Sequence, residues 1–130
     1  MLLFINTLYA NPPENQQWEY INDTDSKDTG KVTEYIDIST VKVVGAQNPM
    51  IKCWLKKDFE KLHMTVLTKI NIDVNSYNYQ IVEEEFQHMG GKYTNDKIYE
   101  DSAWETPREE SNMYNTIFDI VGWALINHKL

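Results

Sequence analysis

The C-terminal part of the chain differs in pattern from the rest and places the strongest constraint on the fold. Thr106, Pro107 and Glu109 have the order of a helix capping box: a hydroxyl at the N-cap, a proline at the first helical position and a glutamate three residues after the cap. Glu109 and Glu110 are expected in the first turn, where they complement the helix dipole. Apolar residues then recur at every fourth position and predict a helix from about 107 to about 127: Met113, Ile117, Val121 and Leu125.

Upstream of this helix, apolar and polar residues alternate in short runs that are separated by turn-forming residues. The expected strands are residues 17–21, 31–38, 41–44, 50–57, 63–75, 77–86 and 92–100, with a turn at Gly90-Gly91. We therefore expect an α+β fold: an antiparallel β-meander of five to seven strands packed against one C-terminal helix. The polar strand 92–100 is expected at an edge, where it could pair with a second copy, so a homodimer stays open.

Length and charge narrow the class of protein. A chain of 130 residues is sufficient for one domain. The formal net charge is −8, with 20 acidic against 12 basic residues, which argues against nucleic acid and anionic membrane surfaces as partners. No segment is long and apolar enough for stable insertion into a bilayer.

The first residues have the character of an export signal. Residues 1–10 are mostly apolar and are followed by the polar, proline-containing stretch Asn11–Gln17. We expect residues 1–10 to be the remnant of a secretory signal peptide cut after Ala10, and residues 11–130 to form the domain. Two features of a signal peptide are missing: a basic n-region, and a small residue two places before the cleavage residue, where Leu8 stands. An ordinary N-terminal segment is therefore the alternative.

Residues that could carry chemistry are few, and none of them forms a recognised motif. Cys53 is the only cysteine and is expected to be a buried strand thiol, with Ile51 and Leu55 on its face and Trp54 on the other. The histidines are far apart and show no metal-binding spacing: His63, His88 and His128. We expect no cofactor and no metal.

Two groups of acidic residues have spacings that could form a site. Glu83 and Glu85 share a strand face and could serve as acid and base in a cleft, although a solvated strand face is the simpler interpretation. Asp23, Asp25 and Asp28 lack the glycine and the distal glutamate of an EF-hand, so a calcium loop of that type is not predicted, and a loose surface calcium site stays open as the alternative. These groups predict no catalytic residue.

The order of several short motifs resembles the surface-adhesin protein E-like domain of small exported bacterial proteins. The motifs are listed in chain order: Trp18-Glu-Tyr20, Tyr35-Ile-Asp37-Ile-Ser39-Thr-Val41, Lys52-Cys-Trp54-Leu-Lys56, and Trp104-Glu-Thr-Pro107 with Ser111. The resemblance covers roughly Trp18 to Val121. The chain departs from the family at two positions where relatives commonly have cysteines that could form a disulfide bridge. Val74 and Val121 lie near those positions here, so an apolar contact would replace the bridge.

The residues of these motifs also have a structural interpretation. Asp37 is expected to bond backbone amides at the corner that follows it, and Lys56 to point outward from its strand. Trp54 and Trp104 are expected to fill the space between sheet and helix. The family name derives from adhesins that bind host matrix proteins, but no binding residue is carried over.

Three functional hypotheses follow, of which the first two do not require catalysis. The first is an exported, non-enzymatic bacterial surface or envelope module, adhesin-like, that binds a protein partner such as a host matrix or envelope protein. The alternative is an acidic inhibitor or immunity-type protein that neutralises a basic enzyme by charge complementarity. A small hydrolase using Glu83 and Glu85 would require a closed apolar pocket around both carboxylates.

Overall fold

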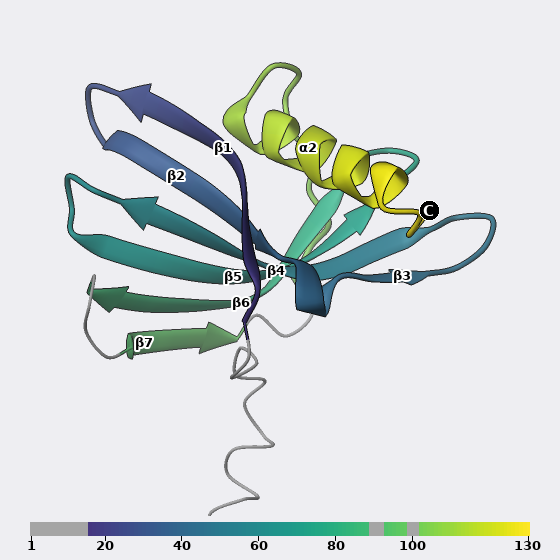
Figure 1. Ribbon diagram of the computed structural model, residues 1–130, viewed down its shortest axis with the longest axis horizontal. Helices are drawn as coiled ribbons and strands as arrows, with labels where there is room; N and C mark the ends of the chain where they lie inside the picture. Colours follow the sequence, from purple (N-terminus) through teal and green to yellow (C-terminus); the bar gives the residue numbers. More distant parts are fainter. Residues whose placement is uncertain (1–15, 89–92, 99–101) are drawn as a thin grey trace, which may run out of the picture.

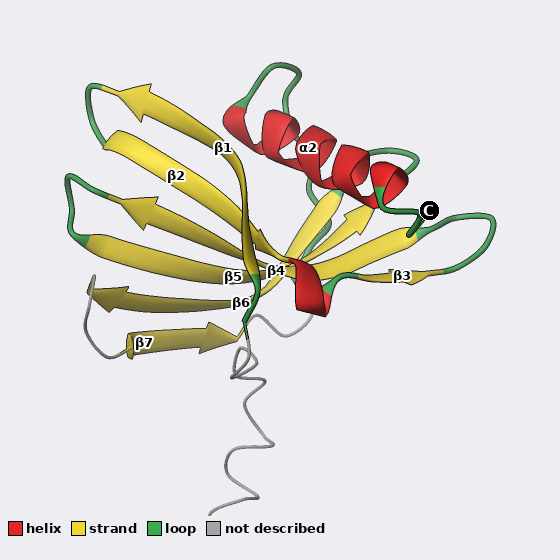
Figure 2. Cartoon of the chain, in the orientation of Figure 1, coloured by secondary structure: helices red, strands yellow, loops and turns green. Residues whose placement is uncertain are grey.

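The computed structural model describes residues 16–88, 93–98 and 102–130, so the expected signal remnant and the Gly90-Gly91 turn lie outside the described residues. The described part contains seven strands and one α-helix (Figures 1 and 2). In chain order the elements are β1 (Trp18–Ser26), β2 (Gly30–Asp37), the 3-10 turn η1 (Ile38–Thr40), β3 (Lys42–Val44), β4 (Met50–Phe59), β5 (Met64–Asp73), β6 (Tyr79–His88), β7 (Tyr93–Ile98) and α2 (Asn112–Ile126).

All strand pairings are antiparallel, and the sheet has the order β1-β2-β4-β5-β6-β7. The short strand β3 pairs with the first residues of β4, on the edge that β2 occupies further along. The predicted α+β meander with a C-terminal helix is confirmed, as is the edge position of the last strand. Two strands are longer than predicted, since β1 runs to Ser26 and β4 to Phe59.

Helix α2 lies across one face of the twisted sheet (Figure 1). Their apolar side chains form a single core cluster that includes Ile36 and Ile51 from the sheet and Ile117 and Ile120 from the helix, all with no exposed surface. Cys53 belongs to this cluster and is 2% exposed, so the prediction of a buried strand thiol is confirmed. Since side chains alternate along a strand, Lys52, Trp54 and Lys56 lie on the face away from the helix.

The predicted start of the helix is wrong. The N-cap is Ser111, whose hydroxyl accepts a hydrogen bond from the Tyr114 amide at 3.2 Å. Glu110 has a φ of 62°, which interrupts any helical path from residue 107, so Glu109 and Glu110 precede the first turn. A tertiary contact explains the later start of the helix. Glu105 pairs with Tyr79 of β6 through two backbone hydrogen bonds of 2.8 and 2.9 Å, which hold this segment extended.

The apolar stripe is only partly as predicted. Ile117 and Val121 are buried, whereas Leu125 is 57% exposed, and the remaining buried residues are Thr116, Ile120 and Ala124. An α-helix turns about 100° per residue, so a spacing of four advances the stripe by about 40° at each step. Over the three steps from Met113 to Leu125 the stripe drifts by about 120° and leaves the packed face.

Gly122 stands in the middle of α2 with open space around it, since a Cβ added there would have no atom within 4 Å. The helix therefore does not need this glycine for a close approach to the sheet. We expect Gly122→Ala to raise the free energy of unfolding by about 0.5–1 kcal/mol, because alanine loses less backbone entropy in a helix. Urea unfolding of both proteins measures the difference, and a destabilised variant would contradict the open environment.

Candidate functional site

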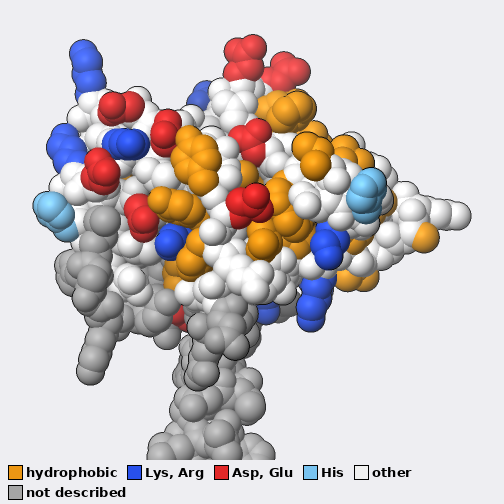
Figure 3. All heavy atoms as spheres, viewed as in Figure 1, with side chains coloured by type: hydrophobic (Ala, Val, Ile, Leu, Met, Phe, Trp, Pro, Cys, Tyr) orange, Lys and Arg blue, Asp and Glu red, His pale blue; other side chains and the backbone are white. Residues whose placement is uncertain are grey.

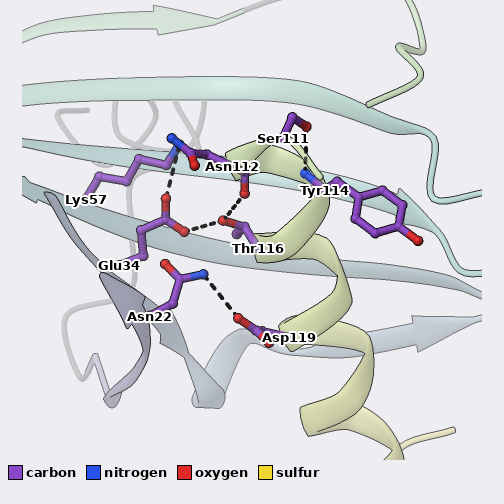
Figure 4. Close-up of polar contacts among 8 residues, drawn as sticks. All are labelled: Asn22, Glu34, Lys57, Ser111, Asn112, Tyr114, Thr116 and Asp119. Carbon is purple, nitrogen blue, oxygen red and sulfur yellow. Dashed lines mark hydrogen bonds and ion pairs between the residues drawn. The ribbon is translucent and has the colours of Figure 1, made fainter. Parts of the chain in front are cut away.

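A polar cluster lies between the helix and the sheet at the N-terminal end of α2 (Figure 4). Glu34 of β2 is 3% exposed, and its carboxylate accepts a hydrogen bond from the Thr116 hydroxyl and forms an ion pair with Lys57 at 3.7 Å. The same hydroxyl lies 2.9 Å from the carbonyl oxygen of Asn112, so its one proton serves two acceptors. One carboxylate oxygen of Glu34 therefore holds the helix through Thr116, and the other pairs with Lys57 of the neighbouring strand β4.

Two further polar contacts fix α2 against the edge strand β1. The Asn22 amide donates to Asp119 at 3.1 Å (Figure 4), and the Trp123 indole N–H donates to Glu19 at 2.6 Å. Together with Glu34 they connect successive turns of the helix to β1 and β2. These contacts position the helix on the sheet, while the buried side-chain oxygen of Asn22 has no hydrogen-bond partner.

A shallow apolar groove of about 260 Å³ lies on the helix side of the sheet, beyond the part that α2 covers. Its walls come from the central strands β4, β5 and β6, with Met113 of the helix at one end and Lys57 and Glu84 as charged members. Glu84 therefore faces the opposite way from Glu83 and Glu85, as the alternation predicts.

The face away from α2 carries an aromatic band made of Trp18, Tyr20, Tyr35 and Lys56. The Lys56 ammonium lies 5.0 Å from the centre of the Trp18 ring and 4.4 Å from that of Tyr35, within the range of cation–π attraction. Tyr20 and Tyr35 meet edge to face with ring centres 6.3 Å apart, and Tyr20 is 54% exposed. The outward position predicted for Lys56 is confirmed, and its charge is spread over two rings.

This aromatic band is held in place by strand register. Cross-strand partners place Tyr20 opposite Tyr35 and Tyr35 opposite Lys56, so the three side chains form a row across β1, β2 and β4. The Tyr20 hydroxyl also donates to Asp23 at 3.1 Å. Desolvation and then this contact with Asp23 raise the pKa of the Tyr20 phenol above its usual value, so it stays neutral at physiological pH.

The β5–β6 part of the same face contains three buried side chains next to the aromatic band. Leu67, Glu83 and Glu85 are only 2–3% exposed there. The two glutamates share this face as predicted, but the simpler interpretation of them as a solvated face is wrong because both are buried. Neither of them lines the apolar groove of the described part.

The corner after β2 is built around Asp37, and the prediction that this side chain bonds backbone amides there is confirmed. One carboxylate oxygen accepts from the Ser39 amide at 3.1 Å, the Ser39 hydroxyl at 2.6 Å and the Gln17 amide at 3.1 Å. Thr40 continues the corner, since its hydroxyl donates to the Asp37 carbonyl at 2.8 Å and accepts from the Trp54 amide at 3.0 Å. These bonds fix the direction in which the chain enters β3.

The remaining sequence candidates lie apart from one another. Burial, and secondarily the charge of Asp37, raises the pKa of the Cys53 thiol to about 12, so the thiol is not a nucleophile at neutral pH. Among the described residues, no group of three or more histidine, cysteine or acidic side chains is placed to hold a metal ion. His63 and His128 occupy left-handed backbone positions next to β5 and after α2.

The roles predicted for two tryptophans are wrong. Trp54 is buried on the face away from the helix, and Trp104 is 44% exposed, so neither fills the space between sheet and helix. That space is occupied by isoleucines and by Glu34 with Thr116. A signal for Glu34 was present in the sequence, since it alternates in phase with Val32 and Ile36 and so had to face inward.

No helix in the described part of the chain is long and apolar enough to cross a membrane. Comparisons of the chain with models of protein families, with curated proteins and with solved structures find no match.

Proposed function

We propose that this chain is a non-enzymatic binding module, exported to the bacterial surface or envelope, that recognises a protein partner through its aromatic band. The band is the observation that carries the proposal. Tyrosine and tryptophan are enriched at protein interfaces because they offer large, rigid contact areas with a polar end. A row of them on a sheet face, exposed at Tyr20 and half-buried at Trp18 and Tyr35, is a suitable recognition surface.

The polar groups of the described core support a structural rather than a catalytic use. Glu34 is engaged by Thr116 and Lys57, and the Cys53 thiol is protonated and buried. A binding module needs a stable scaffold beneath an accessible face, and these groups contribute to the scaffold. The export part of the proposal rests on the apolar residues 1–10 and the polar stretch that follows them.

Photo-crosslinking from two matched positions tests the proposal. Tyr20, in the aromatic band, is 54% exposed, and Phe118, on the outer side of α2, is 58% exposed. We expect benzoylphenylalanine at position 20 to cross-link a defined protein in envelope or culture-medium fractions, with competition by the purified unlabelled chain. Position 118 should give little of that product, and the captured chain should begin at Asn11.

Other outcomes would contradict specific parts of the proposal. A competed cross-link from position 118 alone would move the interface to the helix. A partner that is a basic cytoplasmic enzyme, captured by a chain that still contains residues 1–10, would favour the inhibitor or immunity-type alternative.

A further inference from the structure

A second feature of the face away from α2 is a hollow of about 540 Å³ next to the corner that Asp37 fixes. We call it the lysine hollow; residues that line it include Ser39, Thr40, Lys42, Val44, Lys52, Trp54 and Lys69. Its volume is within the range of sites that hold a small ligand or a few side chains of a partner. Trp54 is 5% exposed and is one of the more buried of these residues.

Strand register brings the three lysines together from different parts of the chain. Lys42 of β3 is directly opposite Lys52 of β4, and Lys69 of β5 is directly opposite Trp54, two residues further along β4. Like charges at directly opposite positions destabilise a sheet, so the pair of Lys42 and Lys52 is unfavourable without an anion nearby. The arrangement is a local reversal of sign on a chain with a formal net charge of −8.

The three lysines differ in their cross-strand neighbours. Lys69 is directly opposite Glu83, which is 3% exposed on the same face, whereas Lys42 and Lys52 are opposite each other. The hydroxyls beside the hollow are occupied, since Ser39 donates to Asp37 and Thr40 donates to the Asp37 carbonyl. Recognition in the hollow therefore falls to the ammonium groups. Figure 3 shows basic and acidic side chains mixed near the β1–β2 turn. At the opposite end of the molecule, below α2, the basic side chains in view lie apart from the acidic ones.

The edge beside the hollow favours an extended peptide. Among the described strands, β3 pairs with β4 alone, so the other edge of Lys42–Val44 is available for backbone hydrogen bonds. A peptide added to such an edge places every second side chain on the same face, about 7 Å apart. Acidic side chains at those positions would reach the lysines, whereas a long polyanion would also meet the acidic remainder of the surface.

We propose that the lysine hollow binds an acidic, extended segment of a protein partner, with the partner's carboxylates between Lys42 and Lys52. The inference deepens the proposed function, because it names the chemistry of the segment that the same sheet face recognises. It is independent of the aromatic band in its residues and can fail separately.

Calorimetric titration of the full chain with two synthetic peptides tests the inference. One peptide alternates glutamate and threonine over eight residues, and the other has glutamine in place of each glutamate. We expect binding of the first peptide alone, weakening as salt is raised because the ion pairs are screened. The double variant Lys42→Gln, Lys52→Gln should weaken binding about tenfold, as the loss of two exposed charge contacts allows.

The matched control is the double variant Lys27→Gln, Lys31→Gln, which changes the net charge equally at the β1–β2 turn, where both side chains are exposed. It should bind the glutamate peptide as the unchanged chain does. Equal weakening in both double variants would overturn the site, since attraction would then depend on net charge alone. Absence of peptide binding would overturn the inference, and the cross-linking from Tyr20 would still test the proposed function separately.

A further titration with inorganic phosphate and with a sulfated disaccharide distinguishes the source of the anion. Tighter binding of either than of the peptide, lost in the Lys42, Lys52 double variant, would overturn the assignment to a protein segment. Thermal unfolding of each variant confirms that a loss of binding does not result from a loss of folding.

Discussion

Ile117→Ala is expected to lower the free energy of unfolding by about 2–5 kcal/mol, because it removes three methyl or methylene groups from a position with no exposed surface. Ile117 belongs to the core cluster in which isoleucines of α2 meet those of β2, β4 and β5. The surrounding side chains come from several elements and cannot all move to fill the cavity, so both contacts and apolar burial are lost. Urea unfolding followed by circular dichroism measures the change.

Two positions on the same helix provide the controls for this prediction. Ile126→Ala is the identical substitution at a side chain that is 78% exposed, and Leu125→Ala removes a member of the predicted stripe that is 57% exposed. Each should change the free energy of unfolding by no more than about 0.5 kcal/mol, as surface substitutions usually do. A loss at Leu125 as large as at Ile117 would mean that the fourth-residue stripe, rather than the observed face, packs on the sheet.

Asp37→Ala is expected to lower the free energy of unfolding by about 2–3 kcal/mol, since hydrogen bonds to a charged acceptor contribute more than neutral ones. Asp37 has no exposed surface, and its substitution would leave the amides of Ser39 and Gln17 without their acceptor. The corner that leads into β3 would loosen, so we also expect the lysine hollow to lose affinity for the glutamate peptide. Chemical unfolding and the same calorimetric titration measure the two effects.

Two further variants distinguish the role of Asp37 in the corner from a general effect of removing a negative charge. Asp37→Asn keeps one oxygen able to accept the corner bonds and should cost less than the alanine variant. Asp25→Ala removes a carboxylate from an exposed position of β1 and should be nearly neutral. If Asp25→Ala were as destabilising as Asp37→Ala, the loss would reflect net charge and not the corner.

Much of the fold follows from local sequence pattern. The alternation of Ile51, Cys53 and Leu55 with Lys52 and Trp54 predicts both the strand and its inward face, and the structure confirms both. Strand periodicity can be read from sequence because it depends only on the backbone geometry of neighbouring residues. The corner at Asp37 is also local, since its side chain bonds the amide two residues ahead.

The start of α2 shows where local pattern fails. Thr106, Pro107 and Glu109 have the composition of a capping box, but the hydroxyl of Thr106 donates to Asn78, a residue 28 positions away in the chain. The bridge between Glu105 and Tyr79 holds this segment extended, and the helix begins only after Ser111. A long-range contact therefore prevails over a local propensity that contributes about 1 kcal/mol.

The sequence by itself determined the strands, their inward faces, the single C-terminal helix and the burial of Cys53, because these depend on periodicity and on neighbouring residues. Only the tertiary structure decided which side of α2 packs, that Glu34 meets Thr116, and that Lys42 lies opposite Lys52. The physical reason is the same in each case. Such contacts depend on strand register and helix rotation, which are fixed when distant segments pack together and are not encoded in any one segment.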